Sequence, residues 1–365
     1  MRVCLVSERL RRPYDEGIKN LATRLALELG SAHEVLTLTM GGMPDPEYSI
    51  RNIEVNRLFL GRGLASEIRH FKPDAIVYVP TACATLFSVV RARVLGQYYP
   101  SAHTAMITLQ PRPYSSLTRR MMRCMGSPRG GRFVPDWVLA QSERTCRSLS
   151  GLGFRTALLP PAVDTERFRP PSPLERATLR QRYGLTDSAR VVTHVGHLKT
   201  KRSLDAFLTL QELPDVHGIV VASTSTRPDE QVRASLHAAG VTVIDTYVPA
   251  IEDVYRLSDL YLFLAESETA AIELPLSVLE AMACNLPIVT TPFGGLADVF
   301  PAGNGLIYWD GSTDLRALID AALSSPSSTR SLVAARTWAA AAGTLEGLLF
   351  DNANPSRAAQ PEATR

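Results

Sequence analysis

A cluster of prolines interrupts the chain near its middle. Within 14 residues the sequence has five of them: Pro160, Pro161, Pro170, Pro171 and Pro173. Proline lacks a backbone N–H and fixes its own φ angle, so neither a helix nor a strand continues through such a run. The chain has 365 residues, about twice the length of a typical domain. The proline run therefore predicts a linker between two domains, residues 1–168 and residues 169–336.

Short apolar runs alternate with helical patterns on both sides of this linker. Before it, Arg2–Val6 has the pattern of a buried strand, and Gly17–Leu29 follows with leucines at helical spacing. After it, the alternation restarts at Arg190–Val195 and continues to Gly305–Tyr308. Strands that alternate with helices indicate a parallel sheet covered on both faces. We therefore expect an α/β fold with two doubly wound, Rossmann-like domains, which bind ligands in the cleft at the carboxyl ends of their strands.

The chain ends with one more helical pattern and a tail. The pattern covers residues 337–350 and follows a stretch rich in serine and proline. We expect this helix to pack back on the first domain, and residues 351–365 to form a disordered tail.

Composition narrows the class of protein. Apolar residues make up 45% of the chain and charged residues 21%, which is typical of a soluble globular protein. The five cysteines are widely spaced and form no CxxC pair, which argues against a disulfide framework and a zinc ribbon. We find neither a signal peptide nor an apolar run of the roughly 18 residues that span a bilayer. We therefore expect a cytoplasmic protein.

The net charge of +3 is unevenly distributed. Residues 1–170 carry 24 Lys and Arg against 14 Asp and Glu, whereas residues 171–365 carry 15 against 22. The basic first half and the acidic second half are expected to meet different partners.

Residues Glu268–Phe300 carry the densest pattern of chemical interest. There a proline-containing loop precedes a predicted helix, Leu276–Ala283, with Glu280 in its first turn. A carboxylate at that place can accept hydrogen bonds from ligand hydroxyls, while the free N–H groups of the same turn face an anion. One element can thus hold a ribose and a phosphate together. The alternative is that Glu280 only complements the helix dipole.

The second half of this segment resembles the donor-binding signature of the retaining family 4 glycosyltransferases of GT-B fold: PLSVLEAMACNLPIVTTPFGGLADV. Further matching segments are DWVLAQSERTCRSLSGLGF, LLPPAVDTERFRP, VVTHVGHLKTKRSL and DEGIKNLATRLA. The resemblance covers most of the chain. It implies a GT-B fold, with two domains facing across a cleft, and a retaining hexosyltransferase that moves a sugar from a nucleotide-diphosphate donor to an acceptor hydroxyl. It further implies no metal and no cofactor, the donor being UDP-, GDP- or TDP-linked.

The resemblance assigns roles to the glutamates of this segment. Glu280 falls on the second family glutamate, which contacts the ribose, and we group its neighbour Leu279 with it as a substrate-binding residue. The first family glutamate, associated with the transferred sugar, would fall eight positions earlier, on Ile272. The nearest carboxylate is Glu273, which we expect to act as the catalytic glutamate from a loop slipped by one residue. The alternative for Glu273 is a solvated loop acid.

A basic loop after Arg190–Val195 resembles the phosphate clamp of the family. Gly196 is in place, His197 stands where the family has an arginine, and Arg202 follows five residues later beside Lys201. A guanidinium can grip a phosphate with two hydrogen bonds. We expect Arg202 and then Lys201 to be catalytic, and Gly196 and His197 to bind substrate. The alternatives are a solvated basic loop and a structural histidine.

Two positions in the first domain correspond to family site residues. Gly17 falls on the glycine loop that faces the diphosphate and the acceptor, and glycine allows a close backbone approach. Its alternative is a simple turn between strand and helix. Gln110 stands where the family commonly has a histidine, so we expect an amide donor in the substrate site there.

Three other functions are alternatives. A nicotinamide dehydrogenase needs GxGxxG after a strand, which neither GIKNLA nor GHLKTK supplies. A nucleotide-sugar epimerase would use the donor without an acceptor. A catalytically silent binding or partner protein is compatible with the altered glutamate loop and with Gln110. The sequence also lacks DxD, HExxH and clustered Cys and His, so we expect no metal.

An arginine-rich segment, residues 112–132, lies on the expected acceptor side. It has six arginines and no acid, with apolar residues interleaved: Arg112, Leu117, Arg119, Arg120, Met121, Met122, Arg123, Met125, Arg129 and Arg132. An apolar stripe flanked by arginines is typical of a segment on an anionic membrane surface or around an anionic acceptor. We expect peripheral contact with the inner face of a membrane and, because aromatic residues are sparse, no nucleic acid. The alternative is a solvated loop, or a helix whose methionines pack inward.

Overall fold

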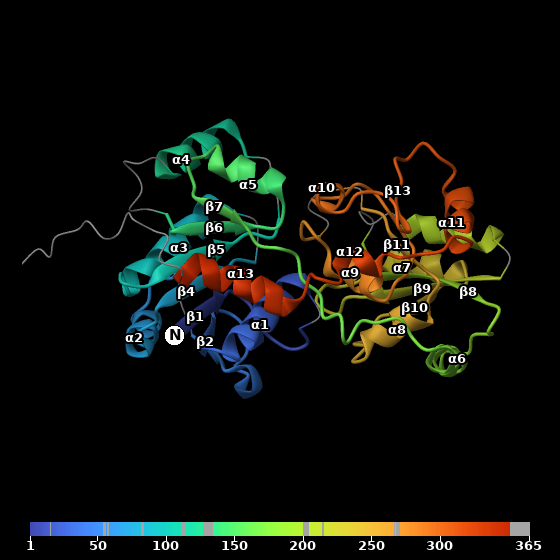
Figure 1. The fold of residues 1–365 in the computed structure, drawn as a ribbon, viewed down its shortest axis with the longest axis horizontal. Coiled ribbons are helices and arrows are strands. Elements are labelled where there is room, and N and C mark those ends of the chain that lie inside the picture. Colours follow the sequence, from blue (N-terminus) through green and yellow to red (C-terminus); the bar gives the residue numbers. More distant parts are fainter. Residues whose placement is uncertain are drawn as a thin grey trace, which may run out of the picture.

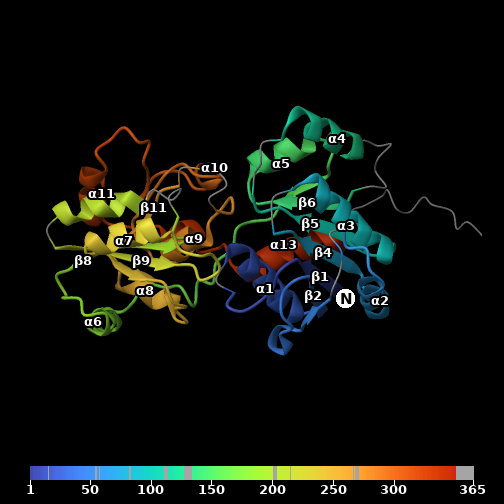
Figure 2. The same cartoon turned by 180° about the vertical axis from the view of Figure 1, so that it is seen from behind.

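The computed structural model describes residues 1–350 except 15, 54–55, 57, 82–83, 111–113, 127–133, 200–203, 214, 266 and 268–270. Two bodies lie side by side, each built on one sheet with helices on both faces (Figures 1 and 2). Because all pairs of neighbouring strands in both sheets are parallel, the carboxyl ends of each sheet's strands share one edge. The predicted α/β fold with two doubly wound domains is confirmed.

The sheet of the first domain has the strand order β3-β2-β1-β4-β5-β6-β7. Its strands are β1 (Arg2–Ser7), β2 (Glu34–Thr39), β3 (Ile50–Asn52), β4 (Ala75–Val79), β5 (His103–Ile107), β6 (Trp137–Ala140) and β7 (Thr156–Leu158). Its helices are α1 (Gly17–Gly30), η1 (Pro46–Tyr48), α2 (Arg62–Phe71), α3 (Leu86–Tyr98), α4 (Ser116–Gly126) and α5 (Glu143–Ser150).

Successive residues of β1 serve the two faces of this sheet. Val3 and Leu5 pack with α1 on one face, whereas Cys4 and Val6 pack with α2 and α3 on the other. Side chains alternate along a strand, so an uninterrupted apolar run is what a strand covered on both faces requires.

The sheet of the second domain has the order β10-β9-β8-β11-β12-β13. Its strands are β8 (Arg190–Gly196), β9 (Val216–Ala222), β10 (Thr242–Ile244), β11 (Leu260–Phe263), β12 (Ile288–Thr290) and β13 (Leu306–Tyr308). Its helices are α6 (Pro173–Arg182), η4 (Leu204–Glu212), α7 (Glu230–Ala238), α8 (Ile251–Leu257), α9 (Leu276–Ala283), α10 (Leu296–Val299), α11 (Leu315–Leu323) and α12 (Arg330–Val333).

The proline-rich connection contains neither helix nor strand between residues 159 and 172, yet it is well packed. Val163 and Phe168 are buried in the core of the second domain. The guanidinium of Arg330 donates hydrogen bonds to the carbonyl oxygens of Thr165 and Phe168 at 3.0 Å each. These contacts hold the connection against the second domain.

The last helix, α13 (Trp338–Phe350), returns to the first domain, where it lies beside α1 in both views (Figures 1 and 2). Trp338, Leu345 and Leu349 join the same buried cluster as Val3 and Leu5. The tail that we expect to be disordered, residues 351–365, lies outside the described residues. In the part of the chain that the structure describes, no helix is both long and apolar enough to cross a membrane.

Candidate functional site

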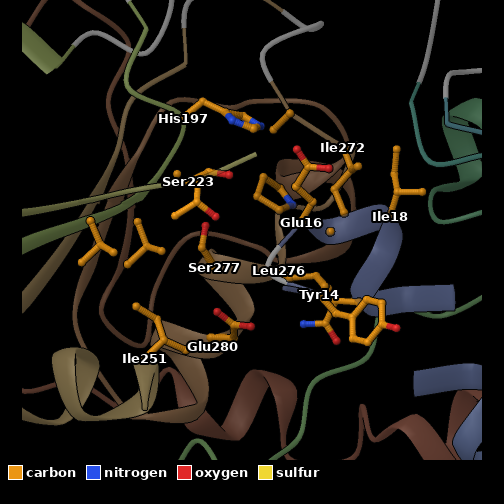
Figure 3. Close-up of a pocket in the computed structure, with 18 of the residues that line it drawn as sticks. Tyr14, Glu16, Ile18, His197, Ser223, Ile251, Ile272, Leu276, Ser277 and Glu280 are labelled. Carbon is orange, nitrogen blue, oxygen red and sulfur yellow. The ribbon is translucent and has the colours of Figure 1, made fainter. Parts of the chain in front are cut away.

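A cleft of about 440 Å³ lies between the two domains. Its first-domain wall includes the start of α1 and the loops after β4 and β5, and its second-domain wall includes the ends of β8 and β9 and the start of α9. Figure 3 shows His197, Ser223, Ser277 and Glu280 on the second-domain side and Ile18 on the side of α1. Both domains thus use the carboxyl edge of a parallel sheet, where α/β proteins commonly bind ligands.

Glu280 lines this cleft from α9. The helix starts at Leu276, so Glu280 is its fifth residue and the first turn carries no acid, which corrects our placement of Glu280 in that turn. The hydroxyl of Tyr255 donates a hydrogen bond to Oε2 over 2.9 Å. Burial raises the pKa of Glu280 to about 7, although this hydrogen bond and the charges of Arg167 and Arg24 act in the opposite direction. The carboxyl group thus changes charge near neutral pH.

Gly196 and His197 also line the cleft. Gly196 is the last residue of β8, and His197 follows it half-buried, with Nδ1 2.9 Å from the hydroxyl of Thr226. Glycine at the strand end leaves room for a ligand beside the backbone. Arg202 and Lys201, the predicted catalytic cations of the same loop, lie outside the described residues.

Gly17 begins α1 and faces the cleft. The capping residue before it, Glu16, makes no side-chain hydrogen bond to the helix, so the dipole of a 14-residue helix points at the cleft without a side-chain cap. A Cβ atom on Gly17 would lie 2.6 Å from Cδ1 of Ile272, which also lines the cleft. Figure 3 shows Ile272 beside Glu16 and Ile18. The position of the first family glutamate is thus an apolar contact between the domains.

Gln110 follows β5 and lines the cleft from the first domain. Its Nε2 donates a hydrogen bond to the carbonyl oxygen of Ala271, 3.0 Å away in the second domain. The predicted amide donor is therefore engaged with the other domain at the edge of the site.

Two predicted site residues are absent from the lining of the cleft. Leu279 is fully buried in the core of the second domain, although it directly precedes Glu280 on α9. Glu273 is also fully buried, and its Oε1 accepts hydrogen bonds from the hydroxyls of Ser142 and Thr145 in the first domain. The structure therefore brings Gly17, Gln110, Gly196, His197 and Glu280 together and leaves Leu279 and Glu273 outside.

Arg167 lines the cleft and was not singled out from the sequence. Its Nη2 lies 2.7 Å from Oε2 of Glu252, and its charge lowers the pKa of Glu280. Arg167 lies in LLPPAVDTERFRP, one of the segments that resemble the family, and this match is the sequence signal that points to it.

Tyr14 is a second cleft residue that the sequence did not reveal. Its hydroxyl donates a hydrogen bond to Asp45 over 2.7 Å, and Arg12 binds the same carboxylate at 2.7 Å. No periodic pattern marks the irregular segment between β1 and α1, so sequence reasoning had no basis for choosing this tyrosine.

Two Rossmann-like domains that bind across a shared cleft define the GT-B class of fold, and solved structures share it. A glycosyltransferase from Rickettsia africae superposes with a TM-score of 0.73 at 14% identity, covering 95% of this chain and 99% of that one. The Anabaena protein HepE, crystallised in complex with UDP, has a TM-score of 0.71 at 16% identity and covers 96% of both chains. The predicted GT-B fold is confirmed.

The family comparison agrees with the fold. Residues 189–325 match the family model described as "Glycosyl transferases group 1", which confirms the resemblance for most of the second domain. The sulfoquinovosyl transferase of Arabidopsis thaliana is 26% identical over 82% of this chain and 61% of its own length. The chain spans less than two thirds of the curated relatives that it matches.

Proposed function

We propose that this protein is a glycosyltransferase that moves a sugar from a nucleotide-diphosphate donor to an acceptor hydroxyl. The observation that carries the proposal is Glu280, a carboxylate that faces the interdomain cleft from within the region matched by the glycosyltransferase family model. A carboxylate can accept hydrogen bonds from two neighbouring ribose hydroxyls. UDP is the first donor nucleotide to test because HepE, a protein of the same fold, was crystallised with it; GDP and TDP are the others.

The chemistry would rest on electrostatic stabilisation. As the bond to the sugar breaks, negative charge grows on the diphosphate and the sugar acquires oxocarbenium character. The start of α1 and the loop after Gly196 supply backbone N–H groups on either side of the cleft. Arg202 and Lys201 remain the predicted cationic groups. We propose a retaining hexosyltransferase that needs neither metal nor cofactor.

Nucleotide release from UDP-, GDP- and TDP-sugars, with and without candidate acceptors, tests this proposal. We expect acceptor-dependent release from one donor class, unchanged by a metal chelator, and a product whose anomeric configuration, read by NMR, matches the donor. An inverted product would refute retention, and loss of activity with the chelator would refute metal independence. Acceptor-independent conversion of the donor sugar would indicate an epimerase instead.

The second candidate is a catalytically silent nucleotide-sugar-binding protein. It is favoured by one observation, the contact between Ile272 and Gly17 where the family has a glutamate. Nucleotide binding in calorimetry without turnover of any donor and acceptor pair would support this candidate over the enzyme.

Helix α4 supports the predicted contact with an anionic membrane surface, the inner face of the membrane in a cytoplasmic protein. Leu117 and Met121 are exposed, at 70% and 44%, beside the exposed Arg119, Arg120 and Arg123. Met122 is buried and Met125 partly buried, so about half of the apolar stripe is core. Arg112, Arg129 and Arg132 lie outside the described residues.

Co-sedimentation with vesicles of rising anionic lipid content tests this contact. We expect binding at low salt that weakens when Arg119, Arg120 and Arg123 are changed to Ser, because each cation near such a surface contributes about 1 kcal/mol. Binding that survives the triple change would exclude α4 as the contact.

A further inference from the structure

The loop that leads into α9 belongs to the second domain by sequence, but part of it, together with the first residue of the helix, packs in the first domain. Ile272 and Leu276 are buried in the cluster that contains Leu21 of α1 and Leu109, which follows β5. The backbone N–H of Glu273, between them, donates a hydrogen bond to the carbonyl oxygen of Leu109 over 2.5 Å. Apolar side chains at the start of α9 and in the loop before it thus complete the core of the first domain.

The side chain of Glu273 anchors this loop to α5. Its Oε1 accepts a hydrogen bond from the hydroxyl of Ser142, the residue that caps α5, and another from the hydroxyl of Thr145 over 2.7 Å. The positive end of the α5 dipole favours a carboxylate at this place. Burial raises the pKa of Glu273, and the two hydroxyls lower it. Within the described residues, Oε2 has no hydrogen-bond partner.

Two glycines enclose the backbone of Glu273 from the second-domain side. The N–H of Gly295 donates to the carbonyl oxygen of Glu273 over 3.1 Å, and a Cβ atom on Gly294 would lie 2.3 Å from that oxygen. Gly294 also has a φ of +58°, which favours glycine. Arg144 of α5 donates to the carbonyl oxygen of Gly294 over 2.7 Å. The niche around Glu273 is therefore closed by both domains.

We propose that Glu273 is a positioning residue: by accepting the Ser142 and Thr145 hydroxyls it fixes the loop to the first domain, so that Ile272 forms the cleft wall against Gly17. Its action on the reaction passes through Ile272 and through the relative position of the domains, and this part rests on the proposed glycosyl transfer. The wall at this point of the cleft is apolar, and it is complete only when both domains meet.

The pair Glu273→Gln and Glu273→Ala separates positioning from catalysis. The amide oxygen of glutamine can accept both hydroxyl hydrogen bonds without a charge, whereas alanine accepts neither. We expect Glu273→Gln to keep kcat/KM within about threefold of wild type and Glu273→Ala to lose about tenfold or more, because two buried hydroxyls lose their acceptor. An equal, large loss in both variants would overturn the proposal, because it would show that the negative charge itself is needed.

A measurement without turnover keeps the anchor testable if no donor is found. X-ray scattering of the unliganded full chain should show a larger radius of gyration for Glu273→Ala than for wild type and for Glu273→Gln. An unchanged radius in Glu273→Ala, with normal unfolding temperature, would overturn the anchor even if the enzyme is active. A confirmed anchor in a chain without transferase activity would instead refute only the proposed function.

Thr145→Val removes one donor with little change of shape and covers the case in which Glu273→Ala does not fold. It should shift the radius of gyration in the same direction as Glu273→Ala, and by less. The matched control is Thr178→Val on α6, where the lost hydroxyl donates within its own helix. Equal behaviour of the two threonine variants would overturn the proposal.

Discussion

Glu273 and Glu280 stand seven residues apart in the same domain, yet they lie in opposite surroundings. Glu280 faces the cleft from a helix and accepts a hydrogen bond from the hydroxyl of Tyr255 in its own domain. Glu273 lies in the loop before that helix, with two hydroxyl donors from the other domain and no access to the cleft. Burial raises the pKa of both. The raised pKa values thus follow from burial in both cases and do not distinguish the two glutamates, whereas the donors do: the donor to Glu280 comes from its own domain and the donors to Glu273 come from the other domain.

The largest expected effect is on nucleotide binding. Glu280→Ala should weaken nucleotide affinity by about 1.5 to 3 kcal/mol, the scale of a hydrogen bond to a charged group. Glu273→Ala should change the affinity for the free nucleotide much less, because Glu273 is outside the cleft lining. Titration calorimetry of both variants, with folding checked by circular dichroism, measures the difference. Equal losses would remove the distinction between the two glutamates.

The contact between Ile272 and Gly17 gives the second prediction. Gly17→Ala would place a Cβ atom 2.6 Å from Cδ1 of Ile272, the flexible end of that side chain. Overpacking typically costs about 1 to 3 kcal/mol, and we expect the lower end because Cδ1 can move. The midpoint temperature of thermal unfolding and the value of kcat/KM should both be lower in Gly17→Ala than in wild type.

A second substitution, Ile272→Val, tests whether the defect of Gly17→Ala can be rescued. Because Ile272→Val removes Cδ1, the double variant should recover most of the unfolding temperature and most of the kcat/KM that Gly17→Ala loses. If the losses simply add, Ile272 does not form the wall against Gly17 in solution.

The resemblance to the family selected Gly17, Gln110 and Gly196, and the structure brings all three together in the lining of one cleft. This agrees with the rule that ligands bind at the carboxyl ends of parallel strands, because Gly196 ends a buried strand and Gln110 follows another. The roles of these residues in substrate binding stay predictions. The catalytic roles of Arg202 and Lys201 also stay predictions.

The sequence could not predict the parts that depend on distant partners. The hydroxyls that hold Glu273 lie 131 and 128 positions earlier, and no pattern near Glu273 indicates them. Leu279 lies outside the cleft lining for a local reason: consecutive residues of a helix point about 100° apart, and here Leu279 packs in the core while Glu280 faces the cleft. A resemblance assigns positions along a chain, whereas the direction of each side chain depends on the tertiary structure.

The third prediction concerns pH. Ribose hydroxyls that donate to Glu280 favour its ionised form, so nucleotide binding should lower the pKa of this group from about 7 and release a proton. Affinity should therefore rise as pH rises through about 7 and level off above it. Calorimetry in buffers of different ionisation enthalpy measures the proton release. Glu280→Gln is the control, and it should abolish the release.

The smallest expected effect comes from Tyr255→Phe. The lost hydroxyl donates to Glu280 and lowers its pKa, so its removal should move the midpoint of the affinity profile to higher pH. Phenylalanine keeps the ring contacts with Phe168 and Tyr261. The free energy of nucleotide binding at neutral pH should therefore weaken by only about 0.5 to 1.5 kcal/mol. The matched control is Tyr261→Phe, whose hydroxyl donates to the carbonyl oxygen of Val195 instead. A midpoint that moves equally in both variants, or in neither, would show that the Tyr255 hydroxyl does not set the charge of Glu280.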